Sequence, residues 1–117
     1  LLAFPIVQDG HLEQITAALD QGNVQSLEQY LDERVEIVLL EEGGVYARAD
    51  AVHKLKAFFT THPGTTFQAI HKGFSGGKSS LYCIGDLRKQ GARYRVFMYI
   101  RVEGGQYLIE ELRFEKN

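Results

Sequence analysis

The hydrophobic pattern of the chain changes its period at Pro63. Before this proline, several apolar stretches follow helical spacing; after it, apolar and polar residues alternate almost to the end of the chain. Helical spacing is typical of helices with one buried side, and alternation is typical of strands in a sheet with two distinct faces. The sequence therefore predicts an α+β fold whose helices lie in the N-terminal half and whose sheet comes mainly from the C-terminal half.

Three helices and a β-hairpin are expected before Pro63. Capping residues, turn residues and β-branched runs set their limits. In chain order they are a helix from Asp9 to Gly22 capped by Asp9, a shorter helix through "VQSLEQYL" capped by Asn23, a hairpin of "VEIVLL" and "VYAR" turning at "EEGG", and a helix "AVHKLKAFFTTH" capped by Asp50.

Four strands are expected after Pro63, joined as an antiparallel meander by the glycine-containing turns "SGGKS", "KQGA" and "EGG". Glycine tolerates the positive φ that tight hairpin turns require, so these segments separate the strands. The expected strands are Thr65 to Phe74, Ser80 to Leu87, Arg93 to Val102, and Gln106 to Glu115.

The stretch "HKGFSGGKSS" resembles a phosphate-binding loop but fails on spacing and context. Such a loop needs four residues between its first glycine and its Gly-Lys pair, and it must lead into a helix. Only three residues separate Gly73 from Gly77, and the next segment is a strand. Gly76 and Gly77 are therefore expected in a hairpin turn with Lys78 in solvent.

Composition limits the classes of function. The 117 residues fit one domain, and 44% hydrophobic with 24% charged residues is ordinary for a globular protein. A formal net charge of −2 offers no basic field for nucleic acid. No run approaches the ~20 apolar residues of a membrane span. The single cysteine, Cys83, has no internal disulfide partner and is expected to be buried.

Residues 1–10 are expected to form an N-terminal arm, and residues 11–117 a single domain. The arm begins "LLAFPIV", which fits either the remaining end of an export signal or an ordinary arm. The compartment therefore stays open, with export as one reading.

Four dispersed segments give the chain a family resemblance: "GNVQSLEQYLDERVEI", "HKGFSGGKSSLYCIGDL", "YRVFMYIRV" and "IEELRFE". They resemble the bacterial domain of unknown function 4783 (DUF4783), and the element order is similar to that of the nuclear transport factor 2-like (NTF2-like) superfamily. The resemblance covers nearly the whole chain from about His11. It implies an NTF2-like cone, in which a strongly curved antiparallel sheet wraps over three helices and a hairpin, with a cavity between. It implies no known activity.

Pairing across even-length hairpins assigns side chains to two faces of the sheet. One face is expected to line the cavity, and its pocket candidates are His71, Cys83, Met98, Glu111 and Arg113. The other face is expected to meet a partner or the core, and its aromatic candidates are Tyr82, Phe97, Tyr99 and Phe114. A single-residue bulge would exchange these assignments beyond it.

The sequence predicts no catalytic residues, metal site or cofactor. His71 and Glu111 are the nearest approach to an acid–base pair, but three strand steps of ~4.8 Å separate them by roughly 14 Å. The four histidines, His11, His53, His62 and His71, lie on different elements without ligand spacing. Asp86 and Arg95 should face each other as a cross-strand ion pair.

The expected function is binding without chemistry. The domain is expected to form a homodimer and to hold a small hydrophobic ligand or a protein partner. The alternative is a cofactor-free isomerase or hydrolase that uses His71 or Glu111 in the cavity. A purely structural interaction domain without an accessible cavity is a third class.

Overall fold

A computed structural model describes residues 10–117 of the chain. The expected N-terminal arm, its reading as a signal remnant and the expected cap Asp9 lie outside the described residues, except that Gly10 begins the first helix. Among residues 10–117, no helix combines the length and the apolarity needed to cross a membrane.

The three predicted helices are present. They are α1 (Gly10–Gln21), α2 (Val24–Glu28) and α3 (Arg48–Thr61). Asn23 caps α2 as predicted, because its Oδ1 accepts a hydrogen bond of 3.1 Å from the Ser26 amide. The expected cap of α3 is wrong: the helix begins before Asp50, at a cap residue, Ala47, that makes no side-chain hydrogen bond. Asp50 instead lies in the first turn, where a carboxylate favours the helix dipole.

The predicted hairpin is also present, as β1 (Leu31–Leu39) and β2 (Glu42–Ala47), but its turn lies earlier than "EEGG". Leu40 takes the left-handed conformation, with φ 61°, between the two strands. Gly43 and Gly44 are strand residues opposite Val38 and Ile37. The glycines therefore do not make the turn, and a leucine adopts the positive φ.

One six-stranded sheet contains the hairpin and the predicted meander, in the order β2-β1-β6-β5-β4-β3. Neighbouring strands are antiparallel except β1 and β6, which run parallel. The "SGGKS" turn is confirmed, with φ of 59°, 65° and 72° at Gly76, Gly77 and Lys78. The meander strands are β3 (Thr66–Ser75), β4 (Ser80–Lys89), β5 (Ala92–Glu103) and β6 (Gln106–Lys116).

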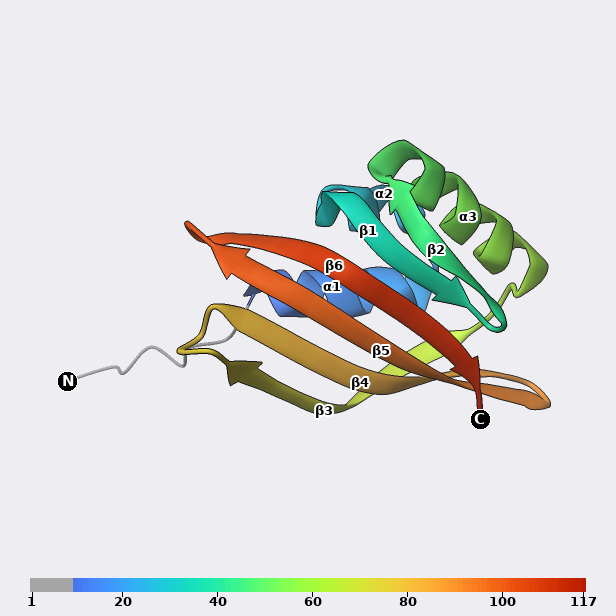
Figure 1. Cartoon of the computed structure of the whole chain (residues 1–117). Helices are drawn as coiled ribbons and strands as arrows, with labels where there is room; N and C mark the ends of the chain where they lie inside the picture. Colours follow the sequence, from blue (N-terminus) through green and yellow to red (C-terminus); the bar gives the residue numbers. More distant parts are fainter. Residues whose placement is uncertain (1–9) are drawn as a thin grey trace.

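The helices cover one face of this curved, open sheet, here called the inner face (Figure 1). Helix α1 packs on β3, and α3 packs on β1 and β2. Apolar residues from α1 and α3 join the inner-face residues of the sheet in one core. A polar contact also joins the two layers: Oδ1 of Asp20 at the end of α1 accepts a hydrogen bond of 2.8 Å from the Phe67 amide in β3.

Two irregularities in the sheet overturn the expected alignment of His71, Cys83, Met98 and Glu111. Cys83 does pair with Met98, but Lys72 lies opposite Cys83 and Leu112 opposite Met98. The register shifts at Ile70 in β3 and at Glu110 in β6, each of which adds one residue to its strand. Because side chains alternate between faces, one added residue moves His71 and Glu111 to the other face.

Candidate functional site

The face of the sheet turned away from the helices, here called the outer face, carries aromatic and aliphatic side chains in its middle. Tyr82 of β4 lies opposite Tyr99 of β5, and Ile84 lies opposite Phe97. All four are half-buried, while Val45 near the edge is 58% exposed. These residues, continued by Val38, form an apolar band across several strands that no helix of residues 10–117 covers.

Arginines and carboxylates are paired on and around this band. The Arg95 Nε lies 3.0 Å from an oxygen of Asp86, whose side chain is only 6% exposed. The cross-strand pair expected from the sequence is thus confirmed. Arg113 donates to Glu111 at 3.0 Å, and this hydrogen bond is the main cause that raises the pKa of Arg113 above its ordinary value.

A third cluster lies at the end of the face near the β5–β6 turn. Arg101 donates to Glu110, to Asp32 at 3.0 Å and to Glu103 at 2.9 Å. The bond to Glu110 is the largest cause of a raised pKa of Arg101. The guanidinium groups of the outer face are therefore charged and neutralised within the chain.

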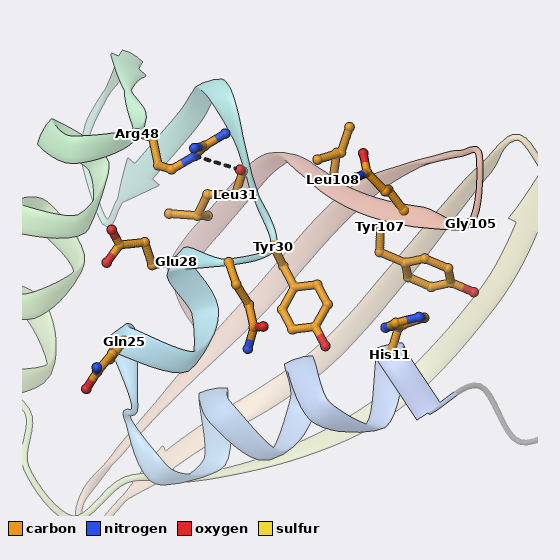
Figure 2. Close-up of a pocket in the computed structure, with 11 residues that line it drawn as sticks. His11, Gln25, Glu28, Tyr30, Leu31, Arg48, Gly105, Tyr107 and Leu108 are labelled. Carbon is orange, nitrogen blue, oxygen red and sulfur yellow. Dashed lines mark hydrogen bonds between the residues drawn. The ribbon is translucent and has the colours of Figure 1, made fainter.

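A groove of about 590 Å³ lies at one end of the fold, and none of the apolar band's residues lines it (Figure 2). It lies between the start of α1, the junction of α2 with β1, and the start of β6. Its volume is within the range of ~300–1,000 Å³ typical of small-molecule sites. Eleven residues line it: His11, Gln25, Glu28, Gln29, Tyr30, Leu31, Arg48, Gly105, Gln106, Tyr107 and Leu108.

Three rings form one side of this groove, which is here called the end groove. The His11 ring lies 5.1 Å from the Tyr107 ring and 6.0 Å from the Tyr30 ring, edge to face in the second case. Tyr30 is 7% exposed, and its hydroxyl donates to the Gln14 side chain on α1. The position of the Tyr30 ring is therefore fixed by packing and by this hydrogen bond.

The other end of the groove is polar. Arg48, the first residue of α3, donates from Nε to the Leu31 carbonyl oxygen at 3.0 Å. This bond holds the guanidinium at the wall of the groove. Glu28 and Gln25 lie at the same end of the groove in Figure 2. This end of the groove thus carries one positive side chain, one negative side chain and uncharged polar groups.

A family model for DUF4783, a domain of unknown function, matches residues 12–115. The chain belongs to the DUF4783 family. A crystal structure of a DUF4783 protein from Bacteroides uniformis is similar over 90% of this chain and 95% of its own, with 27% identity and a TM-score of 0.83. One from Bacteroides fragilis is also 27% identical, over 98% and 100% of the two chains, with a TM-score of 0.78.

The NTF2-like architecture is shown by more distant structures. An NTF2-like protein of unknown function from Silicibacter pomeroyi is 14% identical over 92% of this chain and 90% of its own, with a TM-score of 0.66. At that identity the likeness concerns the fold alone. No sequence among the curated proteins matches the chain.

In this DUF4783 chain, the five pocket candidates divide between the two faces of the sheet. Cys83 and Met98 lie in the apolar core, 1% and 0% exposed. His71 lies opposite Ile84 on the outer face and is exposed. Glu111 and Arg113 also lie on the outer face, where they pair with each other. None of the five lines the end groove.

The aromatic candidates also divide between the faces. Tyr82, Phe97 and Tyr99 lie on the outer face as expected, and Tyr82 does lie opposite Tyr99. Phe114 is fully buried on the inner face, where its ring contacts Phe58 of α3 at 4.7 Å between centroids. The added residue Glu110 is the reason, because it reverses the facing of the β6 residues from Glu111 onward relative to the expected register.

The expected acid–base pair gains no support from the geometry. Glu111 lies opposite Tyr99 and pairs with Arg113, while His71 lies three strands away on β3. Among residues 10–117 no group of three or more His, Cys, Asp or Glu is arranged to hold a metal ion.

Sequence reasoning did not identify the end groove. Its ring residues come from α1, from the residue before β1 and from β6, so nothing in their spacing connects them. Their shared signal is position, because His11, Tyr30 and Tyr107 each lie at or beside the start of an element. Aromatic residues at the starts of elements that meet at one end of a fold are the only indication that the sequence gives.

Proposed function

We propose that this DUF4783 domain is a non-catalytic binding module that forms a homodimer through the outer face of its sheet. The observation that carries the proposal is the uncovered apolar band of Tyr82, Ile84, Phe97 and Tyr99, which no element among residues 10–117 covers. Uncovered apolar surface of this kind on a soluble domain marks an interaction site, and aromatic residues are enriched in such sites.

A second copy of the chain fits this face better than a strongly charged partner. The arginines around the band are already matched by carboxylates: Arg95 by Asp86, Arg101 by Glu110 and Arg113 by Glu111. These arginines are therefore already paired and offer no free positive charge to a strongly acidic partner. In a twofold dimer each patch meets a copy of itself, so the apolar band of one copy would pack against that of the other.

The enzyme alternative has no such support. An isomerase or hydrolase of this size needs an acid or base inside a cavity that excludes water. His71 is exposed on the outer face, and Glu111 forms an ion pair there. Cys83 and Met98, the other expected cavity residues, are packed inside the core.

Multi-angle light scattering coupled to gel filtration tests the homodimer. The wild-type protein should show twice the 13.2 kDa mass of one chain. Phe97→Asp places a charge in the band and should give a monomer. Phe74→Asp is the matched control, because Phe74 is 48% exposed but lies opposite Leu81 and faces the other side of the sheet. It should remain a dimer.

Circular dichroism establishes that both variants are folded. A wild-type protein that is monomeric at its highest soluble concentration, or a Phe97→Asp variant that stays dimeric, would contradict the proposal.

A further inference from the structure

The end groove shares no lining residue with the apolar band of the outer face, through which the homodimer is proposed to form. The groove holds three kinds of chemistry side by side: ring faces, carboxamides and one pair of opposite charges. Each restricts the ligand that fits.

The ring end requires a ligand with a flat, weakly apolar face. The rings of His11 and Tyr107 lie 5.1 Å apart and are tilted by 39°, so they form a corner with no room between them for a third ring. Tyr30 closes the base of this corner and is held by Gln14. The negatively polarised face of an aromatic ring attracts the slightly positive hydrogens of C–H groups.

The polar end requires a ligand with several groups that both donate and accept hydrogen bonds. The Gln25, Gln29 and Gln106 carboxamides line the groove, and each amide offers both functions. Gln29 already donates from Nε2 to the Ser26 carbonyl at 3.1 Å, which leaves its oxygen as an acceptor and its second N–H as a donor. Arg48 has given only Nε to the Leu31 carbonyl, which leaves its two terminal nitrogens as donors.

The charges of the groove indicate a ligand without net charge. Arg48 and Glu28 are the groove's formally charged residues, and they cancel. A phosphate or nucleotide would meet a single arginine with a glutamate beside it, in a chain of net charge −2. A purely apolar ligand would remove the water from these side chains without replacing their hydrogen bonds.

From these observations we propose that the end groove binds a neutral saccharide of about two rings. One sugar ring lies with its C–H face against His11 and Tyr107, and its hydroxyl groups bond to Arg48, Glu28 and the glutamines. Hydroxyl groups are at once donors and acceptors, so they satisfy both the arginine and the glutamate without bringing charge. The open shape of the groove suits affinities on the order of 1 mM.

Amide-detected NMR titration tests the proposal, with maltose, cellobiose and N,N′-diacetylchitobiose as probes. At least one disaccharide should shift the resonances of residues that line the groove. Tyr107→Ala should weaken binding by more than about tenfold. The stacking of a nucleobase on an aromatic side chain is commonly worth that much or more, and we expect a similar gain from a sugar ring on Tyr107. Tyr46→Ala is the matched control: it removes another half-buried tyrosine packed against the core, outside the groove, and should change affinity less than about twofold.

His11→Ala provides a second variant, at an exposed residue whose ring meets the core residue Tyr30 edge to face. His11 is exposed on α1, so its removal leaves the fold intact and should weaken binding by about threefold to tenfold. His53→Ala, at an exposed helical position outside the groove, should bind like the wild type. The proposal is overturned if none of the three disaccharides shifts groove resonances at about 20 mM, far above the expected Kd. It is also overturned if His11→Ala binds as well as His53→Ala, or if a neutral peptide shifts these resonances and the sugars do not.

The test of saccharide binding is independent of the test of the homodimer. Loss of dimer formation in Phe97→Asp with saccharide binding retained would sustain this site, and a dimer without saccharide binding would reject it.

Discussion

The ring of Phe67 lies over the Cα of Gly85 on the neighbouring strand, so closely that a Cβ on Gly85 would lie 2.4 Å from the ring's Cζ and 2.6 Å from the backbone oxygen of Gln68. The contact lies next to the register shift after Ala69, which is the residue paired with Gly85. A glycine inside a strand thus marks a close approach of ring and backbone. It lies beside the bulge that places His71 on the outer face.

We therefore expect Gly85→Ala to destabilise the protein by about 1–3 kcal/mol, the usual cost of overpacking. The backbone oxygen of Gln68 cannot move away as a side-chain end can. Urea unfolding measures the effect. Gly44→Ala is the control, because its nearest neighbour is the end of the Tyr46 side chain at 3.2 Å, which can shift. Equal stability of Gly85→Ala and the wild type would show that β3 can shift freely against β4.

Asp20 joins α1 to the edge strand, and its loss should loosen that edge. Its Oδ1 accepts the hydrogen bond from the amide of Phe67, and the ring of the same residue covers Gly85. Asp20→Ala should cost about 1 kcal/mol, since a single hydrogen bond is removed. Amide hydrogen exchange should also show faster exchange at Phe67. Asp20→Asn keeps an oxygen acceptor and should lose less on both measures; an unchanged Phe67 exchange rate in Asp20→Ala would contradict the role.

The ion pair of Asp86 and Arg95 should contribute more than an ordinary surface pair. The carboxylate is 6% exposed while the guanidinium is 42% exposed, so removal of the arginine leaves a nearly buried charge with only Arg88 at 3.6 Å. Arg95→Ala should destabilise by about 1–2 kcal/mol. Arg93→Ala, an exposed position on the same strand, should stay within about 0.5 kcal/mol. In a double-mutant cycle, a coupling energy near zero between Asp86 and Arg95 would disprove the effect.

The element order could be predicted from the sequence because it depends on local signals. Period, glycine turns and the Asn23 cap each act within a few residues, and the structure keeps them except at "EEGG", where the turn lies earlier, at Leu40. The facing of side chains could not be predicted, because it depends on the extra residues Ile70 and Glu110. Nothing in "QAIHK" or "LIEEL" distinguishes a bulge from regular alternation, and contacts beside the bulge, such as Phe67 on Gly85, form only when the strands pair.

The candidate surfaces were predictable to different degrees. Tyr82, Phe97 and Tyr99 lie on strands whose pairing is fixed by a short hairpin, so their shared face followed from the sequence. Phe114 lies beyond the added residue Glu110, so the same reasoning placed it on the wrong face. The end groove depends on how the starts of α1, β1 and β6 meet in space, which no local pattern encodes.

The Cys83 thiol should be unreactive in the folded protein, and its ionisation should couple to stability at high pH. Burial is the largest cause that raises the pKa of Cys83 above 9.0, and Lys72 opposes this in part. The folded state therefore binds the thiol proton more tightly than the unfolded state. This contribution to stability is complete below pH 9.0 and is lost as the pH rises through the raised folded value.

Two measurements follow from this coupling. The folded protein should react with Ellman's reagent much more slowly than the protein in urea. Cys83→Ala lacks the titrating group, so the wild type should lose more stability than this variant between neutral pH and about pH 10. Equal reactivity in the folded and unfolded states would mean that the strands around Cys83 open readily, because a thiol 1% exposed reacts only when the core between β3, β4 and β5 opens.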